Sequence, residues 1–421
     1  LALIEELLDG TNRVAKPYFG SKGAKQPPGA EVGIAVCTIE KANSLVNLLI
    51  EEQKVEQIGM VVVDELHMIN DKERGYVLEL LLTKLCYVSS RYGQERFTGG
   101  HAEKGRDWRH PQAPFRLNTN DYTSPSQLFI PIIGMSATLP NFAEIGKWLD
   151  ASTFSATEQD RPVPLHQYAL YGNEVYNSKL ELVRPVPEQP SEKCYLCELC
   201  LETLKDGGSI LVFCPSRVGT EVAAKDIAEY FKGVDYDPLM KGDESLLHRL
   251  QEEKEDVERL LKREETSRQP SLLSLFEHAV SYHHAGLTME QRQAVEAGFR
   301  AGVVRVLCAT STLAAGVNLP ARRVIFRGLR VGIAPLDLTR YQQMAGRAGR
   351  LGLDTIGESF ILLEARTHKL PKERCVEWNL ASSLLQPQSS EVRLESCLAR
   401  NQGVWMQRLM LEGVAGGWVR S

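Results

Sequence analysis

Two adjacent carboxylates, Asp64 and Glu65, follow an apolar run and precede His67 in this 421-residue sequence. Such a run, here residues 60–63, is typical of a buried parallel strand. The carboxyl ends of these strands lie at the sheet edge where open α/β sheets bind ligands. Paired acids at that edge suit nucleotide hydrolysis, because the first can hold Mg²⁺ and the second can polarise the attacking water. For these residues alone, a strand followed by a solvated acidic turn is the alternative.

A second candidate group is the segment QMAGRAGR at residues 343–350. Arg347 and Arg350 are three positions apart, so on a helix they would share one face. The flanking glycines would let another surface come close. Guanidinium groups in that arrangement fit a γ-phosphate as arginine fingers. The alternative, a solvated basic helix, gives no reason for the two glycines.

Three shorter motifs each follow an expected strand. Ser136 and Thr138 place two hydroxyls around one small residue, which suits an element that senses nucleotide, although a simple turn fits as well. In residues 310–320, hydroxyls, small side chains and a glycine would let backbone N–H groups approach phosphate. His283 and His284 lack further ligands at metal-binding spacing. A loop that touches nucleic acid or a domain cleft is therefore expected there.

Composition limits the possible classes. The chain is 43% hydrophobic and 24% charged with a net charge of −5, so any nucleic-acid site must be a local patch. No stretch of about 18 uninterrupted apolar residues occurs, so no membrane span is expected. The first residues carry acids where a signal peptide needs a basic flank, so secretion is not expected. Nine cysteines, an odd number, suggest reduced thiols in the cytosol or nucleus.

Cys194, Cys197 and Cys200 form a CxxCxxC pattern. A metal or iron–sulfur site would need a fourth ligand and a loop. The run YLCELCLETL instead has helical periodicity, with apolar residues along one face. Buried cysteines on a helix are the favoured interpretation, and a metal site is the alternative.

The hydrophobic pattern also predicts the elements that position these residues. Strands are expected at 32–37, 60–63, 129–135, 209–213, 280–283, 304–308, 324–326 and 359–363. Helices are expected at 39–49 and 75–87, with a connector from about 165 to 190. Residues 89–126 break every pattern and are expected to be a disordered insertion. The charged segment 246–265 has helical spacing, which favours an amphipathic insert on the second domain over a partner-binding helix.

Seven motifs occur in one order: TIEKAN, DELH, SAT, FCPSR, HHAGL, TSTLAAGVNLP and QMAGRAGR. That order resembles the superfamily 2 helicases of the Ski2-like group, and VVVDELHM, GVNLPARRVI and DTIGES resemble its DNA-repair branch. The resemblance covers residues 34–363. It implies an α/β fold with two RecA-like parallel-sheet domains, followed by the start of a winged-helix domain. The expected domains are 1–165, with an insertion at about 89–126; 190–368, with a helical insertion at about 240–268; and 385–421.

The resemblance also implies a role for each matching residue. Asp64 would bind Mg²⁺ and Glu65 would activate water for ATP hydrolysis. Arg347 and Arg350 would be the arginine fingers. Residues at the nucleotide and domain interface would be His67, Gly316, Asn318, Gln343 and Gly346. Ser136 and Thr138 would couple hydrolysis to strand movement, and the nucleic-acid track would include Thr38, Lys41, Ser216, Arg217, His284 and Thr310.

The sequence departs from this family at the phosphate loop. No G-x-x-x-x-G-K-[ST] occurs, and the GSKGAK stretch at residues 20–25 has the wrong spacing. We expect that loop to precede Leu1 in a longer protein and the chain alone to be inactive.

The function implied for the parent protein is an ATP-dependent 3′–5′ DNA helicase or translocase of DNA repair. It would be a nuclear enzyme acting on single-stranded or forked DNA, with repair proteins as possible partners and no membrane. A non-catalytic nucleic-acid-binding remnant and a Ski2-like RNA helicase are the alternatives.

Overall fold

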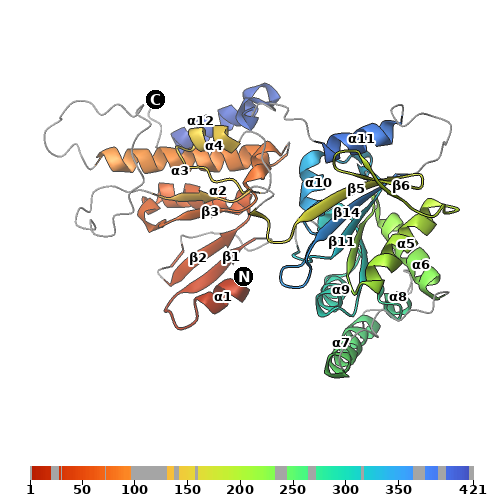
Figure 1. The fold of residues 1–421 in the computed structure, drawn as a ribbon. Coiled ribbons are helices and arrows are strands. Elements are labelled where there is room, and N and C mark those ends of the chain that lie inside the picture. Colours follow the sequence, from red (N-terminus) through yellow and green to blue (C-terminus); the bar gives the residue numbers. More distant parts are fainter. Residues whose placement is uncertain are drawn as a thin grey trace. The chain divides into compact units, whose positions relative to one another are not determined.

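The computed structural model describes residues 2–19, 28–29, 31–71, 73–95, 130–136, 142–156, 160–232, 244–263, 272–313, 317–363, 375–386 and 395–416. The chain divides into two compact units (Figure 1). The first comprises Leu1–Thr153 together with Glu391–Ser421, and the second is Phe154–Ser390. Parallel strands joined through helices build both units, which confirms the expected α/β class.

The first unit is built on two pairs of parallel strands. β1 (Val14–Tyr18) pairs with β2 (Val32–Cys37), and β3 (Val61–Val63) pairs with β4 (Ile132–Gly134). Its helices are α1 (Ala2–Leu7), α2 (Ile39–Glu51), α3 (Gly75–Glu95) and α4 (Phe142–Trp148), with 3-10 turns at Val55–Gln57 and Leu66–Asn70. Apolar side chains of α2 and α3, including Leu49 and Leu85, form the core beneath β3 and β4. The expected strands at 32–37 and 60–63 are thus present. The second is not buried as expected, since Met60 and Val62 are 53% and 55% exposed.

The C-terminal segment of the chain also belongs to the first unit. It contains 3-10 turns at Cys397–Ala399 and Asn401–Gly403 and the helix α12 (Val404–Ala415), drawn in blue beside the orange α3 in Figure 1. The Trp405 ring stacks on Tyr76 of α3 at 3.6 Å between centroids. The start of a winged-helix domain was expected for residues 385–421, and that assignment stays a prediction.

A buried ion pair joins the same segment to α3. The Lys84 ammonium donates to Glu412 Oε2 and to Asn47 Oδ1, each at 2.6 Å. The Lys84 side chain is 0% exposed, so the carboxylate of Glu412 compensates its charge inside the protein. This pair anchors the largely exposed C-terminal helix to the first unit.

The second unit contains one eight-stranded sheet in the order β7-β6-β5-β14-β11-β8-β10-β9. The neighbouring strands β5, β14, β11, β8, β10 and β9 are parallel. The strands β6 and β7 extend the sheet beside β5 as antiparallel strands. Their bounds are β5 Leu165–Tyr171, β6 Glu174–Asn177, β7 Leu182–Pro185, β8 Ile210–Phe213, β9 Val280–His283, β10 Val306–Ala309, β11 Arg323–Arg327 and β14 Gly357–Leu363. Every residue of β8, β9 and β10 is buried, which explains the uninterrupted apolar sequence of β8 and β10.

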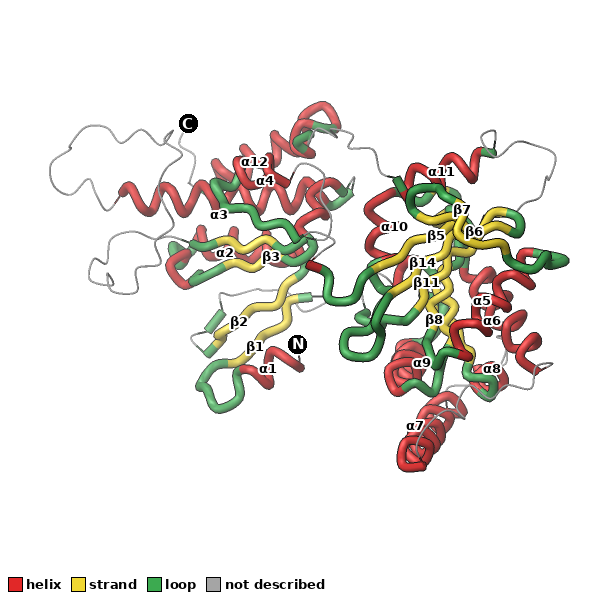
Figure 2. Tube along the Cα trace, in the orientation of Figure 1, coloured by secondary structure: helices red, strands yellow, loops and turns green. Residues whose placement is uncertain are grey.

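Helices cover the sheet of the second unit, with α5 and α6 to one side of it and α9 and α10 to the other (Figure 2). Their bounds are α5 Glu192–Lys205, α6 Arg217–Lys232, α7 Glu244–Arg263, α8 Leu272–Phe276, α9 Met289–Ala301, α10 Leu338–Ala345 and α11 Val376–Leu385; a 3-10 turn spans Ser311–Leu313, and β12 (Arg330–Val331) pairs with β13 (Ala334–Pro335). Thr288 and Gln291 form a capping box that fixes the start of α9. The expected amphipathic insert is the helix α7, whose Val257 and Leu261 are buried in the second unit's core.

Two expectations about elements are wrong. Residues 165–185 are not a connector but form β5, β6 and β7, because a turn at Gly172, with φ of 61°, returns the chain antiparallel to β5. The helix expected at 75–87 continues to Glu95, since polar residues do not by themselves end a helix. The rest of the expected insertion, residues 96–126, lies outside the described residues.

The CxxCxxC pattern lies within the helix α5, where Cys197 and Cys200 are buried. Burial raises the pKa of the Cys197 thiol to about 12 and that of Cys200 well above its usual value, so both stay protonated. No cluster of three or more His, Cys, Asp or Glu side chains suited to a metal ion occurs among the described residues. No helix in the described part is both long and apolar enough to cross a membrane.

Candidate nucleotide and nucleic-acid site

The strand pair β3–β4 positions the two adjacent acids. Beyond the strands, the Met135 N–H donates to the Val63 carbonyl and the Leu66 N–H donates to the Met135 carbonyl, both at 2.8 Å. The turn that carries Asp64 and Glu65 is therefore held at both ends by the strand next to it. Both acids are exposed at the carboxyl end of β3, as the sequence predicted.

The acidic turn has an unusual backbone. Glu65 lies in the left-handed region, with φ of 54° and ψ of 46°, and its N–H donates to Asp64 Oδ1 at 2.9 Å. His67 Nδ1 lies 3.3 Å from Glu65 Oε2, so these two predicted residues are in contact. Mg²⁺ usually takes one or two protein carboxylates and completes its shell with phosphate and water oxygens. The exposed oxygens of Asp64 and Glu65 fit such a site.

The coupling motif is described only in part. The Ser136 hydroxyl is buried and has no hydrogen-bond partner among the described residues. A buried hydroxyl without a partner is costly, so this group is available to an incoming partner. Two other predicted residues, Thr138 and Gly316, lie outside the described residues.

The arginine motif does not have the expected local structure. The helix α10 ends at Ala345 with Gly346 as its C-cap, and Gly349 has φ of 90°. Arg347 and Arg350 therefore do not share a helical face. Residues 347–349 instead run beside residue 321, because the Ala321 N–H donates to the Arg347 carbonyl at 2.9 Å. A Cβ on Gly349 would lie 2.6 Å from Val163, so this path needs glycine.

The two arginines have different partners. Arg347 Nη1 donates to Asn318 Oδ1 at 3.2 Å, which joins two residues predicted to act at the nucleotide. Arg350 binds Asp354 with two guanidinium bonds, from Nε at 2.8 Å and from Nη2 at 2.9 Å. Burial raises the pKa of Asp354, but the bonds from Arg350 outweigh it and leave that pKa below its usual value. Gln343 lies half-buried in the last turn of α10.

One residue that the sequence patterns did not mark, Arg161, supports this motif. The guanidinium of Arg161 donates to the carbonyls of Val163 at 2.8 Å, Gly346 at 3.1 Å and Ala348 at 2.6 Å. It thus holds the backbone between the two arginines. Nothing in the sequence pointed to Arg161, because its partners lie 185 and 187 positions away.

Four predicted nucleic-acid residues meet at one edge of the second unit's sheet. Ser216 and Arg217 follow β8, Thr310 follows β10 and His284 follows β9. These strands are parallel neighbours, so their carboxyl ends coincide. The Thr310 N–H donates to the His283 carbonyl at 3.3 Å, which ties two of the loops together.

The His284 side chain is internal to this edge. Its Nδ1 accepts from the Gly286 N–H at 3.0 Å and its Nε2 lies 2.9 Å from Glu221 Oε1, which assigns the proton to Nε2. The imidazole is only 2% exposed and joins α6 to the loop after β9. What can face a nucleic acid here is the loop backbone and Arg217. Glu221 was not foreseen.

The first unit holds Thr38 and Lys41. Thr38 is the N-cap residue of α2, directly after β2, and its N–H donates to the Tyr18 carbonyl at 3.3 Å. Lys41 is half-buried in the first turn of the same helix. Both therefore lie at the carboxyl end of a parallel strand, the kind of edge the sequence analysis expected.

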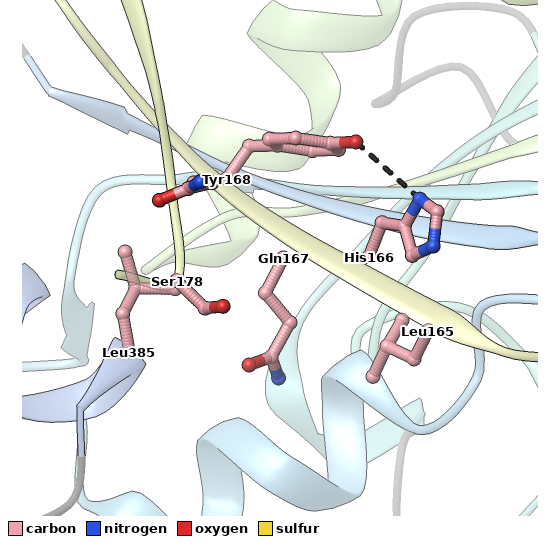
Figure 3. Close-up of a pocket in the computed structure, with 7 residues that line it drawn as sticks. Leu165, His166, Gln167, Tyr168, Ser178 and Leu385 are labelled. Carbon is pink, nitrogen blue, oxygen red and sulfur yellow. Dashed lines mark hydrogen bonds between the residues drawn. The ribbon is translucent and has the colours of Figure 1, made fainter. Parts of the chain in front are cut away.

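A pocket of about 360 Å³ lies elsewhere in the second unit (Figure 3). Its lining residues are Leu165, His166, Gln167, Tyr168, Asn177, Ser178 and Leu385. The Tyr168 hydroxyl and His166 Nδ1 are 3.5 Å apart at its rim. None of the predicted site residues lines this pocket, so it is separate from the candidate site.

Comparison with known proteins agrees with the motif order. Residues 13–145 match the DEAD/DEAH box helicase model, and residues 242–352 match the helicase conserved C-terminal domain. The two matches agree with two RecA-like domains. The chain is thus built as a superfamily 2 helicase core.

Similar proteins indicate a particular group within the superfamily 2 helicases. Over 94% of its length the chain is 40% identical to mouse DNA polymerase theta, and over 87% it is 34% identical to the human POLQ-like helicase. Over 79% it is 34% identical to the ATP-dependent DNA helicase Hel308 of Caldivirga maquilingensis. The chain belongs to the Ski2-like group of helicases, as the motifs indicated. It spans 15%, 30% and 38% of these relatives, respectively.

Proposed function

We propose that this chain is the core of an ATP-dependent DNA helicase of DNA repair. The observation that carries the proposal is the turn after β3, which presents Asp64 and Glu65 at a parallel sheet edge. Relatives named as a DNA helicase and as DNA polymerase theta support DNA over RNA. Translocation in the 3′–5′ direction and a nuclear location are parts of the same proposal.

The chain's own residues would divide the work of hydrolysis. Bound Mg²⁺ would neutralise phosphate charge, with Asp64 as its protein ligand. Glu65 would accept a proton from the attacking water, and the contact with His67 would orient its carboxylate. Arg347 and Arg350 would stabilise charge on the γ-phosphate, with Asn318, Gln343, Gly346 and Gly316 beside the nucleotide. Ser136 and Thr138 would pass the change to the DNA track.

The DNA track would use backbone contacts. Lys41 and Arg217 would meet phosphates, helped by hydroxyls at Thr38, Ser216 and Thr310 and by the loop that His284 supports. Contacts of this kind carry no base code, so little sequence preference is expected. Single-stranded or forked DNA is the proposed substrate, and repair proteins are proposed partners.

A non-catalytic DNA-binding role is the second candidate for the polypeptide as it stands. The observation that favours it is the lack of a G-x-x-x-x-G-K-[ST] in the 421 residues. The two candidates share the DNA track and differ in ATP turnover. An RNA helicase would show its preference in the same binding experiment described next.

Oligonucleotide binding tests the proposal. Fluorescence anisotropy with labelled oligothymidine should show weak binding. A plot of the logarithm of the association constant against the logarithm of the salt concentration should have a slope of roughly −1 to −3, because each phosphate neutralised contributes about −0.7. The double variant Lys41→Ala/Arg217→Ala should make the slope less negative by about one to two units. Lys54→Ala, which removes an exposed cation paired with Glu52, is the matched control and should leave the slope unchanged.

No binding at low salt, or a slope that the double variant does not change, would remove the proposed track. A clear preference for oligouridine over oligothymidine would favour the RNA alternative.

A further inference from the structure

An ion pair joins the first turn of α2 to the segment after the acidic turn. Arg74 Nε donates to Glu40 Oε1 at 2.7 Å and Arg74 Nη2 donates to Glu40 Oε2 at 3.1 Å. Glu40 lies between Thr38 and Lys41, the two residues proposed for DNA in this unit. Hydrogen bonds from Arg74, and to a smaller extent from Thr38, lower the pKa of Glu40.

The residue at the other end of the pair is fixed by its own loop. Asp71 Oδ1 accepts from the Glu73 N–H at 2.9 Å and from the Arg74 N–H at 2.8 Å, while the Asp71 carbonyl accepts from the Gly75 N–H at 3.0 Å. The Asp71 N–H in turn donates to the Met68 carbonyl at 3.0 Å. Arg74 is therefore attached to the 3-10 turn Leu66–Asn70, which begins directly after Glu65.

Packing leaves this loop little freedom. A Cβ on Gly75 would lie 2.4 Å from the Ile69 carbonyl oxygen, so loop and 3-10 turn are in direct contact. Cys397 Sγ also lies 3.2 Å from the same carbonyl oxygen. A displacement of Arg74 must then move the 3-10 turn as well, because closely packed groups do not slide past one another without cost.

We propose that Glu40 and Arg74 are positioning residues that transmit DNA binding at Thr38 and Lys41 to the turn carrying Asp64 and Glu65. The path is α2, the Glu40–Arg74 pair, the loop held by Asp71, and the 3-10 turn. Neither residue touches the reacting atoms. The inference rests on the proposed function, since it needs DNA at the start of α2.

An exposed ion pair with no such role is the competing explanation. Arg74 and Glu40 are 46% and 47% exposed, and pairs this exposed often contribute little to stability. What separates the explanations is the response of the acidic turn to DNA, not the stability of the protein. Amide hydrogen exchange of residues 66–70, with and without saturating oligothymidine, measures that response.

Two single variants with opposite charge effects make the test specific. Arg74→Gln removes a cation and should weaken oligothymidine binding about twofold, whereas Glu40→Gln removes an anion and should strengthen it about twofold. In the unaltered chain, DNA should slow exchange at residues 66–70 about threefold or more. Both variants should lose this slowing, and the exchanged pair Glu40→Arg/Arg74→Glu should regain it. The control is Arg184→Gln at a similar exposed pair with Glu202 in the second unit, which should respond as the unaltered chain.

The outcomes separate the two proposals. Slowed exchange that persists in both single variants would overturn the coupling and leave the DNA track standing. Loss in only the variant that weakens binding would show a simple charge effect and also overturn it. No oligothymidine binding by the unaltered chain at low salt would overturn the DNA track, and with it the coupling.

Discussion

Individual side chains in the arginine motif are held differently from what their spacing suggested. Arg350 is bound in two places to Asp354, whose side chain is only 5% exposed, whereas the bond from Arg347 to Asn318 lies at an exposed position. The first contact is part of the interior and the second is not. The two arginines should therefore respond differently when they are removed.

Replacing either arginine tests this difference, in a polypeptide that also carries a phosphate loop and hydrolyses ATP. Arg347→Ala should lower the catalytic rate on the order of 10³-fold with little loss of stability, as expected for an arginine finger. Arg350→Ala should lower the rate similarly and also destabilise the fold by about 3 kcal/mol, because Asp354 is left buried and unpaired. Steady-state ATP hydrolysis and urea denaturation measure the two effects.

Adding Asp354→Asn to Arg350→Ala provides the control, since it removes the unpaired charge and should recover stability without recovering rate. Wild-type turnover in both single variants would contradict the assignment of fingers.

Sequence patterns marked the candidate site residues, whose roles stay predictions, but they did not mark the residues that hold them in place. Asp64, Glu65 and Arg347 belong to short local motifs. Arg161 and Glu221 act on segments far away in the chain, so no local pattern marks them. The same distance hid the burial of His284.

At the scale of elements, the partly buried carboxylate of Glu412 contributes to the docking of α12. Burial would raise the pKa of Glu412, but hydrogen bonds from Lys84, Arg408 and Asn47 outweigh it and lower the pKa to about 2. A carboxylate whose pKa falls on folding stabilises the folded state above its unfolded pKa, and this stabilisation is lost as the pH falls toward the folded value. The relevant window runs from about 4.5 down to about 2.

The expected result is a loss of about 2 kcal/mol in the free energy of unfolding between pH 5 and pH 3 that belongs to Glu412. Urea denaturation at the two pH values, compared with Glu412→Gln, isolates this contribution. Glu52→Gln, at an exposed ion pair of the same unit, should keep the full pH dependence. Equal pH dependence in the unaltered chain and Glu412→Gln would show that the pair does not stabilise the docking.

Elements were predictable where burial left a clear signature. Strands buried on both faces, such as β8 and β10, are continuous apolar runs, and both were expected from the sequence. The strand β5 carries the polar pair His166 and Gln167 near its start and follows a proline-rich stretch, so it resembled a connector. Its position in the sheet comes from pairing with β14, almost 200 positions away along the chain.

At the scale of the whole molecule, the fold class followed from motif order, whereas the membership of the C-terminal segment in the first unit did not. That membership rests on contacts such as Lys84 with Glu412, 328 positions apart. ATP turnover also depends on the whole molecule, because it needs groups from many parts of a chain.

The 421-residue polypeptide alone should hydrolyse ATP negligibly. Its sequence has no phosphate loop to supply backbone N–H groups and a lysine to the β- and γ-phosphates. A phosphate-release assay with and without oligothymidine measures turnover. DNA-stimulated turnover that disappears in Glu65→Gln would contradict this expectation.

The left-handed backbone of Glu65 has a consequence for how such a site is kept over time. Glycine adopts this conformation without the steric cost that other residues meet. The free energy of unfolding of Glu65→Gly, measured by urea denaturation, should therefore exceed that of Glu65→Ala by about 1 kcal/mol. Both variants lack the carboxylate. A fold selected for stability alone would drift toward glycine here. The glutamate is then expected to persist only where its chemistry is under selection, so its loss in a lineage would mark the loss of hydrolysis before any loss of folding.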